Sequence, residues 1–160
     1  MTGASVVLSS AGGYEAALGN PGRKLRLVQT GNIGLTEAQP IHEITGAIDT
    51  LVIAGGPGAE TGSYDPGFVA WIADAAKRSR RIVSICTGTF LLGAAGLIDG
   101  RKVVTHWKFC DRLATEFPHA RVHPEPTFLQ DGPITLPLES LLVSTWFSLW
   151  LRRIRGMSRL

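Results

Sequence analysis

The stretch that most constrains how this chain can fold is residues 82–92, which read Ile-Val-Ser-Ile-Cys-Thr-Gly-Thr-Phe-Leu-Leu. It opens as a short β-branched run and continues as an apolar pattern of helical period, with Cys86 and Gly88 at the junction. This pattern predicts a strand, a sharp turn, and a helix over residues 87–95 that ends at Gly96. We therefore expect Cys86 to lie in the turn, above the end of the strand.

Two interpretations of Cys86 fit that position. In the first it is a nucleophile, because the amides at the start of the following helix favour thiolate and lower the pKa from its usual value of about 8.5. In the second it is a small buried apolar residue at the end of a strand, as most free cysteines are.

A second strand is predicted over residues 49–54, where an apolar run ends in Gly55-Gly56-Pro57-Gly58. Such a run is typical of a buried parallel strand, and the glycines let the loop backbone approach another group closely. Amides from this loop and from Thr87 could together form an oxyanion hole.

Residues 103–107 predict a short strand that delivers His106 at its carboxyl end. Sites in open α/β sheets lie beyond the carboxyl ends of the strands, so we expect His106 and Cys86 to meet there. His106 is then either a general base or ion-pair partner for the thiolate, or a residue that caps the next helix or bonds the backbone. Cys110 lies on that next helix, predicted over residues 107–117, and we expect it to pack rather than react.

Another helix is predicted to open at Tyr64-Asp65-Pro66, with Asp65 as the N-cap and proline in the first turn. Apolar residues follow at helical spacing, namely Phe68, Val69, Ile72 and Ala75.

Three segments, GGPG (55–58), SICTGTFLLGAAGLIDGRKVVTHW (84–107) and FCDRLATEFP (109–118), resemble the ThiJ/PfpI group of class I glutamine amidotransferase-like domains. Within that group they are most similar to the N-terminal domain of AraC-type transcription regulators and to isonitrile hydratases. The resemblance implies an α/β fold, a flavodoxin-like three-layer sandwich with a mostly parallel sheet and a nucleophile elbow. It also implies that Cys86 is the nucleophile, that Gly56 and Thr87 line the oxyanion site, and that His106 is the nearby imidazole.

The first residues do not match such a fold. Residues 1–18 predict one helix or a broken helix, and a strand follows only at residues 25–28, so we expect the first strand to be missing. Family members carry a first strand that ends in Asp within a pattern like L-D-x-x-G-P, and Met1-Thr2-Gly3-Ala4 resembles the tail of that pattern. By that resemblance, the carboxylate that poises the cysteine would fall immediately before Met1.

The last residues are apolar with a basic end. The apolar part, residues 141–151, is shorter than the roughly 20 residues of a membrane span, which leaves an interfacial anchor or a shifted reading frame. Family members continue with a sequence like YTSAGVTAGIDLALALVEED. Codons for residues 134–154, read one base out of phase, permit Ser-Ala-Gly-Val, Thr-Ala-Gly-Ile-Asp and Leu-Val-Leu-Ala-Leu-Val-Glu-Glu-Asp in that order. We therefore expect a ThiJ/PfpI-like domain over residues 1–134 and a frameshifted tail over residues 135–160.

Composition limits the remaining possibilities. The 160 residues are enough for one core, and the net charge of +3 is concentrated in the tail, so we expect no direct nucleic-acid contact. The two cysteines have no metal-ligand spacing and nothing resembles a signal peptide. We expect a cytoplasmic domain with no metal, no cofactor and no membrane association, and a homodimer is one option.

Three functions remain open, and with them whether the protein is an enzyme. The first is the effector-sensing domain of an AraC-type regulator without its DNA-binding domain, with a small-molecule effector bound near Cys86 and His106. The second is a cysteine enzyme resembling isonitrile hydratase, which would hydrate or hydrolyse a small carbon–nitrogen substrate through Cys86. The third is a redox-sensing thiol. We favour the first, because FCDRLATEFP resembles the regulators more closely.

Overall fold

A computed structural model of the chain describes residues 4–9, 15–19, 39–40, 45–55, 59, 62–125 and 128–137. The elements, in chain order, are β1 (Ala4–Ser9), β2 (Glu15–Gly19), β3 (Gln39–Pro40), β4 (Ile48–Ala54), α1 (Pro66–Lys77), β5 (Ser79–Ile85), α2 (Gly88–Ala94), β6 (Lys102–Val103), the 3-10 helix η2 (Trp107–Phe109), α3 (Cys110–Glu116), β7 (Arg121–Val122), β8 (Phe128–Asp131) and β9 (Ile134–Pro137). This is the predicted α/β architecture.

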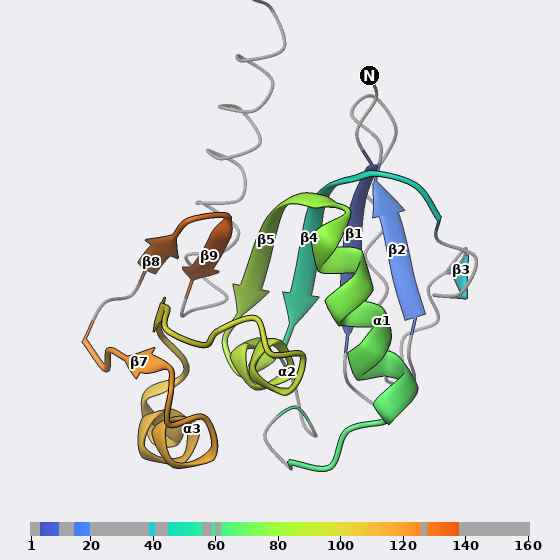
Figure 1. Ribbon diagram of the computed structural model, residues 1–160. Coiled ribbons are helices and arrows are strands. Elements are labelled where there is room, and N and C mark those ends of the chain that lie inside the picture. Colours follow the sequence, from blue (N-terminus) through green and yellow to red (C-terminus); the bar gives the residue numbers. More distant parts are fainter. Residues whose placement is uncertain are drawn as a thin grey trace, which may run out of the picture.

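The main sheet has seven strands in the order β3-β2-β1-β4-β5-β9-β8 (Figure 1). Its central strands β1, β4, β5 and β9 are parallel, whereas β2 and β8 pair antiparallel at the two sides. In the register of β4 and β5, Ala54 lies opposite Ile85. The two strands therefore end side by side, which places the residues that follow them, Gly55 and Cys86, at the same edge.

Helix α1 begins where the sequence predicts. The Asp65 carboxylate accepts a hydrogen bond of 2.7 Å from the Phe68 amide, and Pro66 stands at the first helical position. Phe68, Ile72 and Ala75 are buried, and the helix contacts β4 and β5. The cap and the helical spacing together explain why this segment was predictable.

Helix α2 also follows the prediction, since it is bounded by the turn at Cys86 and by Gly96, whose φ is +70°. It lies in front of the sheet (Figure 1) and contacts β4 and β5. Phe90 on α2 meets Phe109 and Phe117 edge-on, with ring centroids 6.3 Å apart in each pair. These aromatic contacts join α2 to the segment around α3.

The prediction for the first residues was wrong. Residues 4–9 and 15–19 form strands instead of a helix, and β1 pairs in parallel with β4, so a strand does precede residue 25. The short apolar runs were ambiguous on their own, and strand pairing along β4 supplies the backbone hydrogen bonds that decide the outcome. The strand predicted over residues 25–28 lies outside the described residues.

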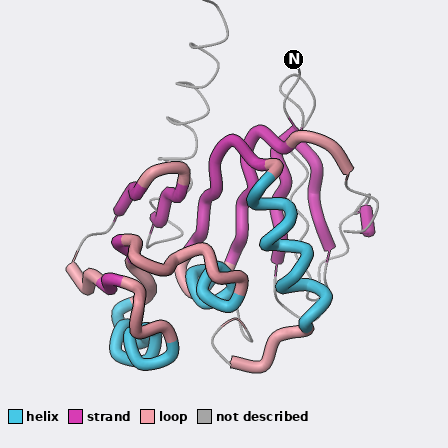
Figure 2. Tube along the Cα trace, viewed as in Figure 1, coloured by secondary structure: helices cyan, strands magenta, loops and turns pink. Residues whose placement is uncertain are grey.

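The strand predicted over residues 103–107 is shorter than expected. Only Lys102–Val103 is a strand, and it pairs with β7 in a separate two-stranded sheet, so it does not join the main one. The next carbonyl, that of Val104, accepts a hydrogen bond from the Thr89 side chain instead of a strand neighbour. The chain therefore continues as a loop (Figure 2) before the 3-10 turn and α3, which replace the single predicted helix.

Strand β9 crosses the predicted domain boundary at Ile134. All of Ile134–Pro137 is buried, and Ile134 and Thr135 pair with Ile82 and Val83 of β5. Residues 138–160 lie outside the described part of the chain. Within the described part, none of the helices has the length and apolar character that crossing a membrane requires.

Candidate functional site

Cys86 occupies a strained turn between β5 and α2. Its φ is +55°, and among the described residues it is the only one other than glycine with a positive φ. A left-handed conformation costs an L-residue roughly 1–2 kcal/mol, so neighbouring groups have to hold it. The side chain is half-buried and forms no disulfide.

Segments from three other parts of the chain hold this turn. The Cys86 amide donates a hydrogen bond of 3.3 Å to the carbonyl of Pro137, and the Cys86 carbonyl accepts one of 3.3 Å from the Thr105 hydroxyl. The preceding carbonyl, that of Ile85, accepts one of 2.9 Å from the Gly55 amide. The turn is thus fixed by β9, by the loop before η2 and by the end of β4.

Gly55 and Gly88 are glycines because the backbones nearly touch. A Cβ on Gly55 would lie 2.6 Å from the Thr87 nitrogen, and a Cβ on Gly88 would lie 2.6 Å from the Ile53 carbonyl oxygen. The structure therefore brings two of the predicted oxyanion residues, Gly55 and Thr87, together beside Cys86. The Gly55 amide already donates a hydrogen bond to the Ile85 carbonyl, so it does not supply an oxyanion donor. The role of Gly55 is to let the backbone at Thr87 come close. Gly56, the third predicted residue, lies outside the described residues.

His106 caps the 3-10 turn. Its Nδ1 accepts a hydrogen bond of 3.3 Å from the Lys108 amide, and its ring stacks on Trp107 with centroids 5.5 Å apart. A neutral imidazole has one N–H and one lone pair, so a lone pair used at Nδ1 assigns the proton to Nε2. In this tautomer His106 presents a donor at Nε2, which suits stabilising a thiolate or an oxyanion better than removing a proton from a thiol.

A buried polar cluster under the elbow was not predicted. Ser84, Thr89 and Thr105 are 1%, 0% and 0% exposed. The Thr89 hydroxyl lies 2.9 Å from the Val104 carbonyl, 3.3 Å from the Cys86 carbonyl and 3.5 Å from the Ser84 hydroxyl. The only sequence signal was the presence of hydroxyl residues inside otherwise apolar runs, which does not by itself show that the runs meet.

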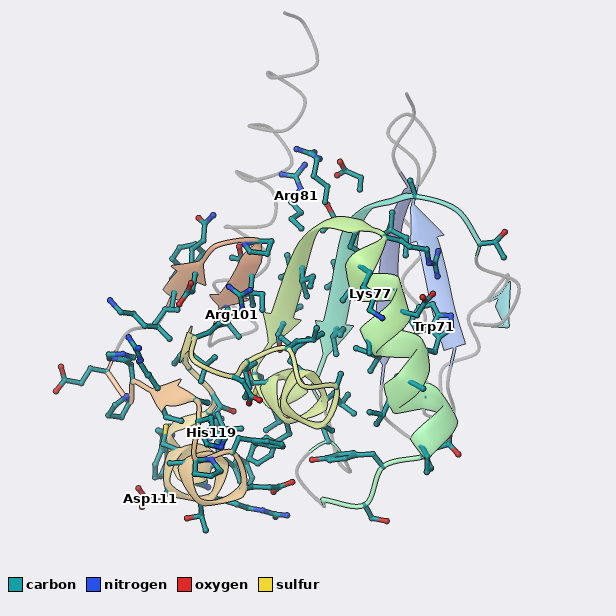
Figure 3. The ribbon with its side chains drawn as sticks, in the orientation of Figure 1. Trp71, Lys77, Arg81, Arg101, Asp111 and His119 are labelled. Carbon is teal, nitrogen blue, oxygen red and sulfur yellow. The ribbon has the colours of Figure 1, made fainter. Side chains whose placement is uncertain are left out.

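Cys110 packs inside the protein, and His119 lies on its surface. Cys110 is buried, and its sulfur lies 3.8 Å from the carbonyls of both Thr105 and His106. Burial, together with the Asp111 carboxylate, raises the pKa of the Cys110 thiol above its ordinary value, although the hydrogen bond with Thr105 opposes this. His119 is exposed on the turn after α3 (Figure 3). Among the described residues, the structure groups no three His, Cys, Asp or Glu side chains that could hold a metal ion.

A charged cluster lies at the opposite end of the sheet, where Figure 3 labels Arg81. The Asp49 carboxylate accepts hydrogen bonds from Arg80, from Arg81 at 3.0 Å and from the Thr50 hydroxyl at 2.8 Å. Burial alone would raise the pKa of Asp49, but these hydrogen bonds outweigh it and the pKa is lowered. The cluster joins the starts of β4 and β5 and has a structural role.

Comparison with known proteins relates the chain to one family. The sequence model described as the DJ-1/PfpI family matches residues 26–135, which include Gly55, Cys86 and His106. Isonitrile hydratase from Pseudomonas putida is 37% identical over 68 residues, which are 42% of this chain and 30% of the hydratase. The HTH-type transcriptional regulator GbdR from Pseudomonas aeruginosa is 32% identical over 72 residues, which are 45% of this chain and 19% of the regulator.

Solved structures show the same fold. A protein from Vibrio parahaemolyticus described as a transcriptional regulator has a TM-score of 0.63 and 26% identity, over 80% of this chain and 68% of that one. A ThiJ/PfpI family protein from Pseudomonas syringae has a TM-score of 0.56 and 22% identity, over 83% of this chain and 62% of that one. The matched stretch spans about half the length, 51%, of a curated relative from Streptomyces lividans that is 43% identical over 72 residues and has no assigned function.

Proposed function

This chain belongs to the DJ-1/PfpI family, and from that premise we propose that residues 1–134 are the effector-sensing domain of an AraC-type transcription regulator. One observation carries the choice of sensing over catalysis. The Nδ1 lone pair of His106 is engaged by the Lys108 amide, so the imidazole is oriented to donate a hydrogen bond and is poorly placed to accept the Cys86 proton.

The effector is a small molecule with a carbonyl or carboxylate group. The Nε2–H of His106 is a hydrogen-bond donor suited to such an oxygen. Cys86 would then act as a wall of the binding site. We propose no nucleic-acid contact for this domain, a cytoplasmic location in keeping with cysteines that form no disulfide, Cys86 and Cys110, and a homodimer as the assembly to test.

The alternative is a cysteine enzyme resembling isonitrile hydratase, and the strained turn at Cys86 favours it. The Cys86 thiolate would add to the terminal isonitrile carbon, and the same carbon would take a proton to give a thioimidate. Water would then add to that carbon while the nitrogen takes a proton, and the sulfur would leave as thiolate, so that the product is the formamide of the same amine. In this mechanism His106 donates a hydrogen bond through Nε2. A redox-sensing thiol is the third option and would use the same half-buried sulfur.

One experiment separates these functions. Wild type and Cys86→Ser are screened against small carboxylates and amides by thermal shift, and both are incubated with a simple alkyl isonitrile while formamide is followed by mass spectrometry. A sensor shifts in melting temperature in both forms and produces no formamide. Formamide production by the wild type that disappears in Cys86→Ser would reject the sensor proposal in favour of the enzyme.

For residues 135–160 we propose that a one-base deletion near Ile134 has shifted the reading frame. The out-of-phase codon match supports this, and strand β9 is compatible with it because strand pairing uses backbone atoms that any residue supplies. Resequencing the gene with its flanks is the test. A confirmed frame would reject the proposal, and a corrected frame that continues into a helix-turn-helix region would also support the sensor.

A further inference from the structure

Thr105 connects the two predicted site residues. Its side chain is 0% exposed, and its hydroxyl donates a hydrogen bond of 3.3 Å to the carbonyl of Cys86, 19 residues earlier in the chain. The residue that follows it is His106. The contact therefore joins the strained turn directly to the segment that carries the imidazole.

The hydroxyl hydrogens of the buried cluster can be allocated. Thr89 has a single hydrogen, and the Val104 carbonyl at 2.9 Å is a better acceptor for it than the Cys86 carbonyl at 3.3 Å. Ser84 can then donate to Thr89, at 3.5 Å. This leaves Thr105 as the hydroxyl that donates to the Cys86 carbonyl.

The Thr105 segment is also fixed from the other side. The Thr105 carbonyl accepts a hydrogen bond from Cys110, and the His106 carbonyl accepts one of 2.8 Å from the Phe109 amide. The His106 ring is held through Nδ1 by the Lys108 amide. Thr105 is therefore held at its hydroxyl by the Cys86 carbonyl and at its carbonyl by Cys110, so it joins the Cys86 turn to the segment that carries His106.

We propose that Thr105 is a positioning residue that couples the orientation of His106 to the Cys86 turn. The inference deepens the proposed function, since it concerns the same site, and it holds whether that site senses or catalyses. Its consequence is that the reactivity of Cys86 depends on a hydroxyl that touches neither the sulfur nor the imidazole nitrogen.

Loss of the hydroxyl has a definite direction. The Cys86 carbonyl oxygen would lose a hydrogen bond that offsets its partial negative charge near the sulfur. The left-handed turn would also lose one of the hydrogen bonds that hold it. A net hydrogen bond is worth about 0.5–1.5 kcal/mol, which corresponds to a rate change of roughly two- to tenfold. We expect Thr105→Val to slow alkylation of Cys86 by that factor and to move its pH profile to higher pH.

The experiment measures iodoacetamide labelling of the Cys86 peptide by mass spectrometry from pH 5 to pH 10. Thr105→Ser keeps the hydroxyl and should restore the wild-type profile. The control is Thr50→Val, which removes an equally buried hydroxyl that bonds Asp49 at the far end of the sheet. A wild-type profile in Thr105→Val, or an equal shift in Thr50→Val at matched melting temperature, overturns the proposal.

A double-mutant cycle with His106→Asn, which removes the Nε2 donor, tests the coupling itself. If Thr105 positions the imidazole, the effect of His106→Asn on the labelling rate shrinks in the Thr105→Val background, whereas additive effects reject the coupling. Failure of the proposed function looks different. In that case no carboxylate or amide would shift the melting temperature of the wild type, while the cycle would still report whether Thr105 couples the two residues.

Discussion

Gly55 and Thr87 approach each other so closely that a single methyl group on Gly55 would lie 2.6 Å from the Thr87 nitrogen. The same methyl would lie 2.7 Å from the Gly88 nitrogen, so two backbone groups of the elbow would have to move. This contact joins the end of β4 to the start of α2, and it explains why the loop after β4 has to begin with glycine.

Gly55→Ala should therefore destabilise the protein and displace the elbow. We expect a loss of about 2–3 kcal/mol in the free energy of unfolding, the range for overpacking a rigid site, measured by urea denaturation. Gly67→Ala in the first turn of α1 is the control, since its Cβ would meet only the Asp65 side chain, at 3.1 Å, and alanine favours helix. Equal stability of the two variants would contradict the close approach.

Cys86 and Cys110 should label at very different rates. Cys86 is only half-buried, whereas Cys110 is buried, and burial raises the pKa of the Cys110 thiol and keeps it neutral. We expect Cys86→Ser to abolish rapid iodoacetamide labelling at pH 7 and Cys110→Ser to preserve it, with each peptide quantified by mass spectrometry. Equally fast labelling of Cys110 in the native protein would refute this assignment.

Two substitutions of His106 separate its cap from its donor. Asn can accept the Lys108 hydrogen bond through Oδ1, so His106→Asn should keep the wild-type stability but lose the Nε2 donor. Gln places an amide N–H at the ε position, so His106→Gln should keep most of the Cys86 reactivity and lose about 1 kcal/mol of stability with the cap. Equal Cys86 labelling rates in the two variants would show that the Nε2 donor has no role.

Asp49 should contribute stability that depends on pH. Its folded pKa lies below the ordinary value of 3.8, so its contribution is complete above that value and is lost as the pH falls through the folded value. We expect Asp49→Asn to cost about 1–2 kcal/mol at pH 7 and progressively less in strong acid, measured by urea denaturation across pH.

The control for Asp49 is Asp74→Asn. Its side chain is 64% exposed and pairs with Arg78 four residues along α1, and exposed pairs of this kind contribute less than about 0.5 kcal/mol. If Asp74→Asn lowered the free energy of unfolding at pH 7 as much as Asp49→Asn does, the cluster between β4 and β5 would contribute no more to stability than an exposed ion pair.

The parts of the fold that could be predicted are those whose signals are local. The turn at Cys86 lies between a β-branched run and an apolar helical pattern, and α1 carries its own N-cap at Asp65. The first residues were not predictable in this way. Residues 4–9 are a short apolar run that fits either a helix or a strand, and only pairing with β4 makes them a strand.

The sequence by itself determined that Gly55 and Cys86 lie at the same end of the sheet, because both follow parallel neighbouring strands that end there. The tertiary structure alone decided what each does there. The Gly55 amide donates a hydrogen bond to the Ile85 carbonyl, and the Thr105 hydroxyl donates one to the Cys86 carbonyl. The Lys108 amide donates one to Nδ1 of His106, which assigns the proton of the neutral imidazole to Nε2. Each outcome depends on a hydrogen bond between groups that local pattern does not pair, so only the packed chain fixes donor and acceptor.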